Sequence, residues 1–152
     1  MKLLFAAMFA AAVLHVLEEY KLPGGFLDLM RRVRPGWASA ITPGFALTIN
    51  AAFLTLCAAA VFWGEAQPVF GLSVAGLLLV NGLAHVVASL RLRTYAPGAV
   101  TGLLLYLPLS IATYGLALHQ GQVSLAGAVL AALWGAAYHL VPIGLLFLSS
   151  HR

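Results

Sequence analysis

Charged residues are scarce in this sequence. Only eight lysine or arginine and four aspartate or glutamate residues occur among 152, so charged residues make up 8% of the chain and hydrophobic residues 62%. Soluble domains carry about 25% charged and about 45–50% apolar residues. A water-soluble domain of this length could not hide so much apolar surface. The composition therefore excludes a soluble globular protein and predicts a single-domain membrane protein.

The sequence also lacks a basic nucleic-acid-binding run and a second cysteine. The net charge is +4, but no basic run with interleaved aromatic residues occurs, so we expect no nucleic-acid partner. The single cysteine, Cys57, lies in an apolar run and cannot form an intrachain disulfide, so we interpret it as a small packing residue.

Five apolar segments are long enough to cross a bilayer, for which a helix needs about 20 mostly apolar residues. Turns that carry proline, glycine or polar residues separate these segments, which comprise residues 3–19, 45–63, 69–90, 99–118 and 125–148. The sequence therefore predicts an all-α membrane protein, a compact bundle of about five transmembrane helices, with kinks at Pro108 and Pro142. A signal peptide is the alternative for the first segment, but that segment ends in His15 and two glutamates rather than in a small-residue cleavage site.

The connection between the first two segments predicts a short amphipathic helix in the headgroup region, at about residues 22–43. An irregular basic loop is the other interpretation. Basic residues also predict the orientation, because one side of the bundle has only Lys2. The opposite side carries Lys21, Arg31, Arg32, Arg34, Arg91, Arg93 and Arg152. We therefore expect a multi-pass protein of the cell membrane, with its N-terminus outside and its C-terminus in the cytoplasm.

Polar residues at membrane depth gather near this cytoplasmic side. They are His15, Glu18, Glu19, Asn50, Asn81, His85, Tyr138 and His139. At a rise of 1.5 Å per residue, most of them occupy a band about 0–14 Å below one interface, with Asn81 a turn deeper. Ionisable groups at such depth are costly, so each is a candidate functional residue.

Helical spacing brings several of these side chains onto common faces. Glu18 lies about 60° to one side of His15 and Glu19 about 40° to the other, so all three can face the bundle interior. Asn81 and His85 are four residues apart and share a stripe. Gly135, one turn before His139, predicts close approach of a neighbouring helix.

Three sequence elements resemble those of the HXXEE family. They are the motif His15-Val-Leu-Glu18-Glu19, the later histidine His85, and Tyr95-Ala96-Pro97-Gly98, in the order typical of that family. The resemblance implies an integral membrane protein of unknown function. His139 is not part of these motifs.

The residue types suggest a metal-dependent membrane enzyme as the first hypothesis. Imidazole and carboxylate groups together suit zinc, iron or manganese, and three protein ligands with one open position are typical of catalytic sites. The candidate ligands are His15, His85 and His139 together with Glu19 or, alternatively, Glu18, and the remaining glutamate could act as a general base. The candidate catalytic residues are Glu18, Glu19 and Tyr95, and the supporting residues are Asn50, Asn81 and Tyr138. Because the site lies under the headgroups, a lipid or another hydrophobic substrate is expected.

Three alternatives use the same residues differently. A metal-free acid–base pair of Glu and His could isomerise or cyclise a terpenoid or sterol-like lipid. His85 and His139 could hold a haem in an electron carrier. Finally, the polar groups could only join helices in an accessory or transport protein. A homodimer is a further expectation, because the Gly- and Ala-rich face of residues 71–82 permits close helix contact.

Overall fold

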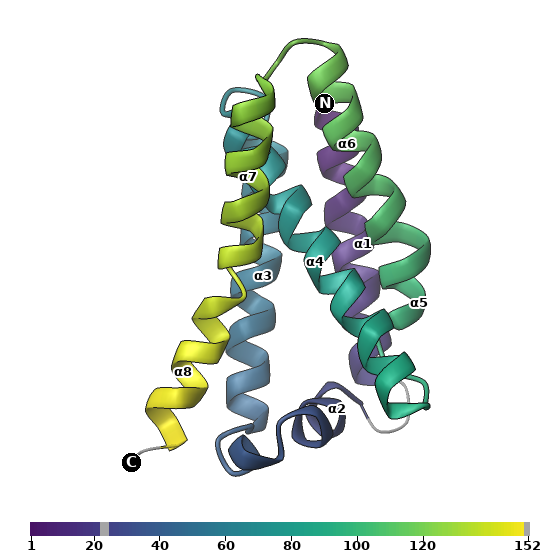
Figure 1. The fold of residues 1–152 in the computed structure, drawn as a ribbon, viewed down its shortest axis with the longest axis vertical. Coiled ribbons are helices and arrows are strands. Elements are labelled where there is room, and N and C mark those ends of the chain that lie inside the picture. Colours follow the sequence, from purple (N-terminus) through teal and green to yellow (C-terminus); the bar gives the residue numbers. More distant parts are fainter. Residues whose placement is uncertain (22–24, 151–152) are drawn as a thin grey trace.

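A computed structural model describes residues 1–21 and 25–150, which form helices and turns without any strand (Figure 1). The elements are α1 (Lys2–Lys21), α2 (Gly25–Val33), η1 (Pro35–Trp37), α3 (Pro43–Trp63), α4 (Pro68–Leu92), α5 (Ala99–Thr101), η2 (Gly102–Tyr106), α6 (Leu107–His119), α7 (Leu125–Ala137) and α8 (Leu140–Ser150). Residues 22–24 of the predicted interfacial segment and Arg152 of the charge count lie outside the described residues.

Five helical segments of the described chain are long and apolar enough to cross a membrane. They are Lys2–Lys21, Pro43–Trp63, Pro68–Leu92, Ala99–His119 and Leu125–Ser149. The fourth segment comprises α5, η2 and α6, and the fifth comprises α7 and α8. The predicted all-α bundle of five long apolar helices is confirmed, as expected for a multi-pass membrane protein. Many large apolar side chains on the outer faces are exposed, which suits contact with lipid.

Helix α4 is the centre of the bundle and packs against α7, α6 and η2, and less extensively against α3. Small residues allow the closest of these contacts. A Cβ atom on Gly135 of α7 would lie 2.6 Å from the backbone of Gly76 on α4, so only glycine fits there. The close approach expected at Gly135 is therefore confirmed. The small-residue face of 71–82, on which the expectation of a homodimer rests, packs within the chain.

The two prolines inside the fourth and fifth segments disturb the helices at the positions expected from their chemistry. Proline lacks an amide hydrogen, and its ring excludes the carbonyl group four residues earlier. Pro108 follows the π-helical turn η2, and Pro142 follows a two-residue interruption at Tyr138 and His139. From this interruption α8 turns away from the axis of α7 (Figure 1).

Helix α2 lies across the end of the bundle at which α1 ends and α3 begins (Figure 1). Residues 25–33 are helical, in agreement with the amphipathic interpretation rather than with an irregular loop. Leu29 is buried, whereas Arg32 is exposed. The Arg31 guanidinium donates a hydrogen bond of 3.0 Å to the carbonyl of Ile41, which joins α2 to the start of α3. The short helix therefore closes one end of the molecule.

Candidate functional site

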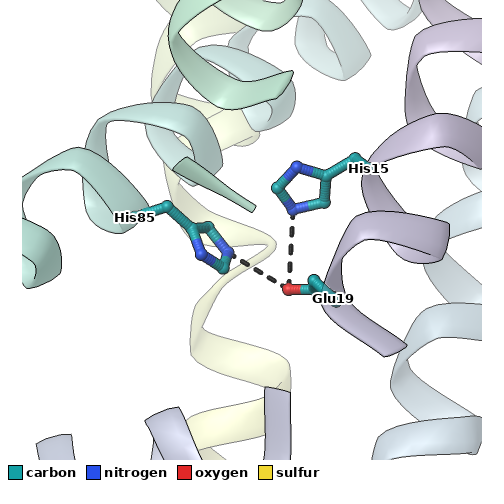
Figure 2. A group of neighbouring side chains, drawn as sticks. All are labelled: His15, Glu19 and His85. Atoms are coloured by element: carbon teal, nitrogen blue, oxygen red, sulfur yellow. Dashed lines mark ion pairs between the residues drawn. The ribbon is translucent and has the colours of Figure 1, made fainter. Parts of the chain in front are cut away.

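His15, Glu19 and His85 form a buried group inside the bundle (Figure 2). His15 and Glu19 lie one turn apart on α1, and His85 projects from α4. Their exposed fractions are only 1%, 2% and 6%. One carboxylate oxygen, Oε1 of Glu19, lies 3.5 Å from Nε2 of His15 and 3.2 Å from Nε2 of His85. One oxygen thus faces two imidazole nitrogens.

The spacing of these atoms fits a metal centre. Ligand atoms at about 2.1 Å from a tetrahedral zinc ion lie about 3.4 Å from one another. The two distances to Glu19 Oε1, 3.2 and 3.5 Å, agree with this value, and the three ligand atoms all lie within 4.8 Å of one another. The buried His15/Glu19/His85 group could therefore hold a metal ion.

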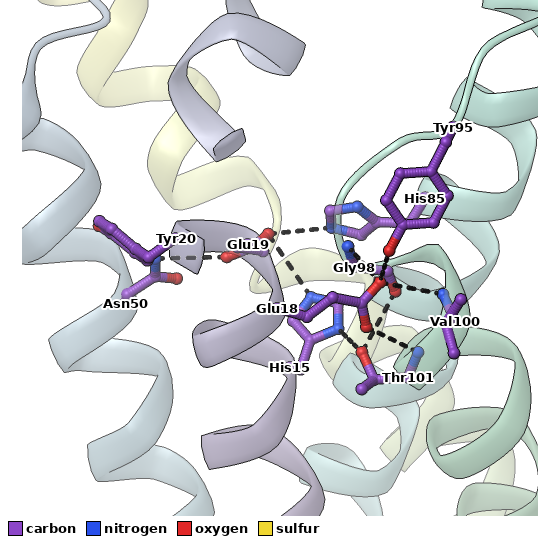
Figure 3. Close-up of polar contacts among 10 residues, drawn as sticks. All are labelled: His15, Glu18, Glu19, Tyr20, Asn50, His85, Tyr95, Gly98, Val100 and Thr101. Atoms are coloured by element: carbon purple, nitrogen blue, oxygen red, sulfur yellow. Dashed lines mark hydrogen bonds and ion pairs between the residues drawn. The ribbon is translucent and has the colours of Figure 1, made fainter. Parts of the chain in front are cut away.

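The buried charge of Glu19 is compensated by its neighbours. A carboxylate removed from water needs an opposite charge or several hydrogen bonds. Its second oxygen, Oε2, accepts a hydrogen bond of 3.4 Å from the side-chain amide of Asn50 on α3, which also donates to the Tyr20 hydroxyl at 3.4 Å (Figure 3). Asn50 thereby helps to keep Oε1 directed at the histidines.

The orientation of the His15 ring is fixed by Thr101. Nδ1 of His15 lies 2.8 Å from the Thr101 hydroxyl oxygen. The same hydroxyl lies 3.4 Å from the carbonyl of Gly98, to which it can donate, and it then accepts from the imidazole if Nδ1 carries the hydrogen. Nε2 of His15 has no hydrogen-bond partner among the described residues. Metal-binding histidines commonly have an outer hydrogen bond of this kind.

Glu18 faces a different part of the molecule from Glu19. Its Oε1 accepts hydrogen bonds from the backbone amides of Gly98 at 2.8 Å and Val100 at 3.1 Å, and its Oε2 accepts from that of Thr101 at 2.9 Å (Figure 3). The first amides of a helix have no partner within the helix and favour a negative charge. Glu18 thus satisfies the start of α5 and joins it to α1.

Tyr95 adds a fourth bond to the same carboxylate, because its hydroxyl donates to Glu18 Oε1. The ring is half-exposed. Partial burial and the hydrogen bond to the Glu18 carboxylate both raise the pKa of the Tyr95 phenol above its usual value. Tyr95 therefore contacts the residue that holds α5 rather than the His15/Glu19/His85 group.

Gly98 forms the wall behind the two histidines. Its φ of +94° is a backbone conformation that favours glycine. A Cβ atom at this position would lie 2.6 Å from Cε1 of His15 and 2.7 Å from Nδ1 of His85. A residue without a side chain is therefore required for both rings to occupy their places.

The remaining sequence-predicted residues line a cavity of about 290 Å³ beside the buried group. Asn81 on α4 and Tyr138 and His139 at the α7–α8 interruption all contribute to its wall, as does Asn50. His139 is not among the three residues whose ligand atoms converge. The Tyr138 hydroxyl lies 3.0 Å from that of Ser73.

Two residues that contact the site do not stand out in the sequence. Thr101 follows the Tyr95-to-Gly98 motif by one helical turn, and only that proximity could have indicated it. Tyr106 stacks on the His15 ring, with centroids 4.6 Å apart. A tyrosine in an apolar segment is ordinarily a packing residue, and the Tyr106 ring does pack in the core.

Comparison with known protein families identifies the family of this chain. Residues 6–113 match the family described as "Protein of unknown function with HXXEE motif", which covers more than half of the chain. The matched range includes His15, His85 and Gly98, whereas His139 lies beyond it. The comparison with curated proteins gives no match, and the comparison with solved structures gives none either. The chain therefore belongs to the HXXEE family of proteins of unknown function.

Proposed function

We propose that this chain is a metal-dependent membrane enzyme that acts on a lipid or another hydrophobic substrate. The observation that carries the proposal is the convergence of two imidazole nitrogens on one carboxylate oxygen at 3.2 and 3.5 Å, in a buried place. If Nδ1 of His15 donates to Thr101, the nitrogen facing Glu19 lacks a hydrogen. A metal ion between that nitrogen and the carboxylate oxygen would then hold the two electron-rich atoms together.

The donor set and its surroundings favour a catalytic rather than a structural centre. Three protein ligands leave one position open in a tetrahedral site, and that pattern is typical of catalytic zinc. Nitrogen and oxygen ligands also suit iron and manganese. The group borders the cavity, so a substrate held there would reach the open position. A bound divalent ion would polarise an oxygen of the substrate or activate a water.

Glu18, Tyr95 and Thr101 act as positioning residues in this proposal. Both oxygens of Glu18 are engaged by backbone amides, so this carboxylate holds α5 in place rather than taking a proton from a substrate. Tyr95 supports Glu18, and Thr101 orients the His15 ring. Glu19, His15 and His85 are the groups that would hold the metal.

The basic residues support a site near the cytoplasmic leaflet. The end of the bundle with α2 carries most of the described lysine and arginine residues, and Glu19 lies in the last turn of α1 at that end (Figure 1). At the other end, the charge of Glu65 is paired with the N-terminal amine at a distance of 3.1 Å. Lys2 contributes the described basic side chain at that end. The positive-inside rule then orients the site toward the cytoplasm.

A metal-free acid–base enzyme is the second candidate. The 3.2 Å contact between Glu19 and His85 would also suit a shared proton, which could isomerise a lipid. Haem binding fits less well because the cavity of about 290 Å³ is only about twice an engineered cavity that holds one benzene.

Elemental analysis of purified protein tests the proposal. Wild type, His15→Ala, Glu19→Ala and His85→Ala would be purified in detergent after expression with zinc, iron and manganese supplied. His119→Ala is the matched control, because this histidine is exposed at the end of α6. We expect one metal ion per chain in wild type and the control, and little in the three site variants. Wild-type protein without stoichiometric metal, or site variants that keep it, would contradict the proposal.

A further inference from the structure

The cavity beside the His15/Glu19/His85 group has several polar lining residues, and the rest of its wall is apolar. The polar residues are His15, Glu19, His85, Asn50, Asn81, Tyr138 and His139. Apolar side chains of α2, α3 and α8 complete the wall, and Leu29, Phe53 and Val141 are examples. A ligand of matching chemistry has a polar head and a hydrocarbon tail.

The volume limits the ligand to one chain. An engineered apolar cavity of about 150 Å³ holds one benzene ring, so the present cavity of about 290 Å³ has room for roughly a dozen carbon atoms. Two acyl chains or the fused rings of a sterol would exceed this space. A single hydrocarbon chain fits, and the rest of a longer chain would leave through an opening.

Such an opening lies along α8. Among the described residues, α8 packs on α7 and on η1, and no comparable packing joins it to α3 or α4. Ala84 on α4 and Val141 on α8 both line the cavity and are both exposed. These helices belong to segments that are long and apolar enough to cross a membrane, and in a bilayer the opening between them would face the hydrocarbon region.

The side-chain oxygen of Asn81 is buried in the cavity wall and accepts no hydrogen bond from a described residue. A buried unpaired acceptor costs about 1–3 kcal/mol. A hydroxyl group can donate to Asn81, whereas an ionised carboxylate only accepts.

We propose that the cavity binds a single-chain lipid with a hydroxyl head, which enters beside α8 and places its head between Asn81 and the metal-binding group. This inference names the substrate class of the proposed enzyme. That the lipid is a substrate rests on the proposed function, whereas its binding in the cavity does not. Three features indicate this kind of ligand: the polar lining residues, the size of the cavity and the lateral opening.

The test uses a long-chain alcohol that carries a photoactivatable diazirine in its tail. Protein in lipid nanodiscs is irradiated with this probe, and labelled residues are mapped by mass spectrometry. Ala52 lines the cavity, so Ala52→Trp should fill it. The neighbouring Ala51 is exposed and does not line the cavity, so Ala51→Trp is the matched control. Metal content and thermal stability are measured on all three proteins.

We expect cavity residues of α3 and α4 to be labelled in wild type and Ala51→Trp, and this labelling to be lost in Ala52→Trp. Dodecanol should compete for the site about fivefold better than laurate, because one hydrogen bond is worth about 1 kcal/mol. Asn81→Leu should remove that preference. Labelling confined to the outer surface, unchanged labelling in a folded Ala52→Trp, or stronger competition by laurate or cholesterol would overturn the inference. Correct labelling of a metal-free protein would contradict only the proposed function.

Discussion

The carboxylate of Glu18 accepts a hydrogen bond of 2.8 Å from the backbone amide of Gly98, eighty residues later in the chain. This contact explains why the two motifs of the sequence belong together. His15-Val-Leu-Glu18-Glu19 provides two of the three residues that could hold a metal ion, and Tyr95-Ala96-Pro97-Gly98 provides the wall behind them. Glu18 joins one motif to the other through this hydrogen bond, whereas Glu19 faces the histidines.

Glu18→Gln should weaken both the fold and the site. In glutamine an NH2 group replaces one carboxylate oxygen, and this NH2 group cannot accept from the backbone amide of Thr101, so one bond to a charged acceptor is lost. We expect a loss of about 1–3 kcal/mol in the free energy of unfolding and weaker metal binding. Thermal unfolding in detergent and metal content would check this result. Glu65→Gln, at an exposed acid, is the control, and equal stability of the two variants would contradict the role of Glu18.

Gly98→Ala should displace the histidines. The added Cβ atom would lie 2.6 Å from the His15 ring and 2.7 Å from that of His85, and a φ of +94° adds strain of about 1–3 kcal/mol. We expect loss of metal together with a lower unfolding temperature. Gly115→Ala is the control because nothing lies within 4 Å of its Cβ position, and it should leave metal binding unchanged. Normal metal content in Gly98→Ala would count against this geometry.

The five membrane helices could be predicted because uninterrupted apolar runs of about 20 residues are typical of helices that cross a bilayer. The depth of the polar residues followed from the same segments, since the rise per residue is fixed. Gly135 was also informative, because a small residue near a polar one permits close packing. These features depend on local sequence alone.

The different contacts of Glu18 and Glu19 could not be predicted from the sequence. Both lie on flanks of the His15 face, and only the position of α5 decides which one meets backbone amides. The position of α5 depends in turn on Gly98 and on the π-helical turn η2. Likewise, His139 lies at the interruption before Pro142, where it lines the cavity and is not among the three residues whose ligand atoms converge.

Thr101→Val should reduce metal affinity without removing any ligand. Valine has a similar shape but no oxygen, so the N–H of His15 would lose its acceptor at 2.8 Å. Loss of such outer partners lowers metal affinity about 10–100-fold. Competition with a chelator of known affinity measures this change, and Thr101→Ser should bind close to wild type. Equal affinities for the valine and serine variants would contradict the role of Thr101.

Tyr95→Phe should make stability less dependent on alkaline pH. The pKa of Tyr95 is raised in the folded protein, so its hydrogen bond to Glu18 stabilises fully below the unfolded pKa of about 10. This contribution is lost as the pH rises through the folded pKa. Because the ring is half-exposed, the free energy of unfolding of wild type should exceed that of the variant by only about 1 kcal/mol at neutral pH.

The difference in the free energy of unfolding between wild type and Tyr95→Phe should then decrease above about pH 10. Denaturant unfolding in detergent across the alkaline range measures this difference. A stability difference that stays constant to the alkaline limit, or no difference at neutral pH, would contradict the assigned contact.

X-ray absorption spectroscopy at the edge of the bound metal tests the central claim most directly, because it reports the ligands themselves. The account predicts a shell of nitrogen and oxygen atoms at about 2.0–2.2 Å for zinc, with the scattering pattern of two imidazole rings. In His85→Ala protein reloaded with metal, that pattern should fall to one ring. A shell of oxygen atoms alone, or two imidazole rings that persist in both His15→Ala and His85→Ala, would contradict it.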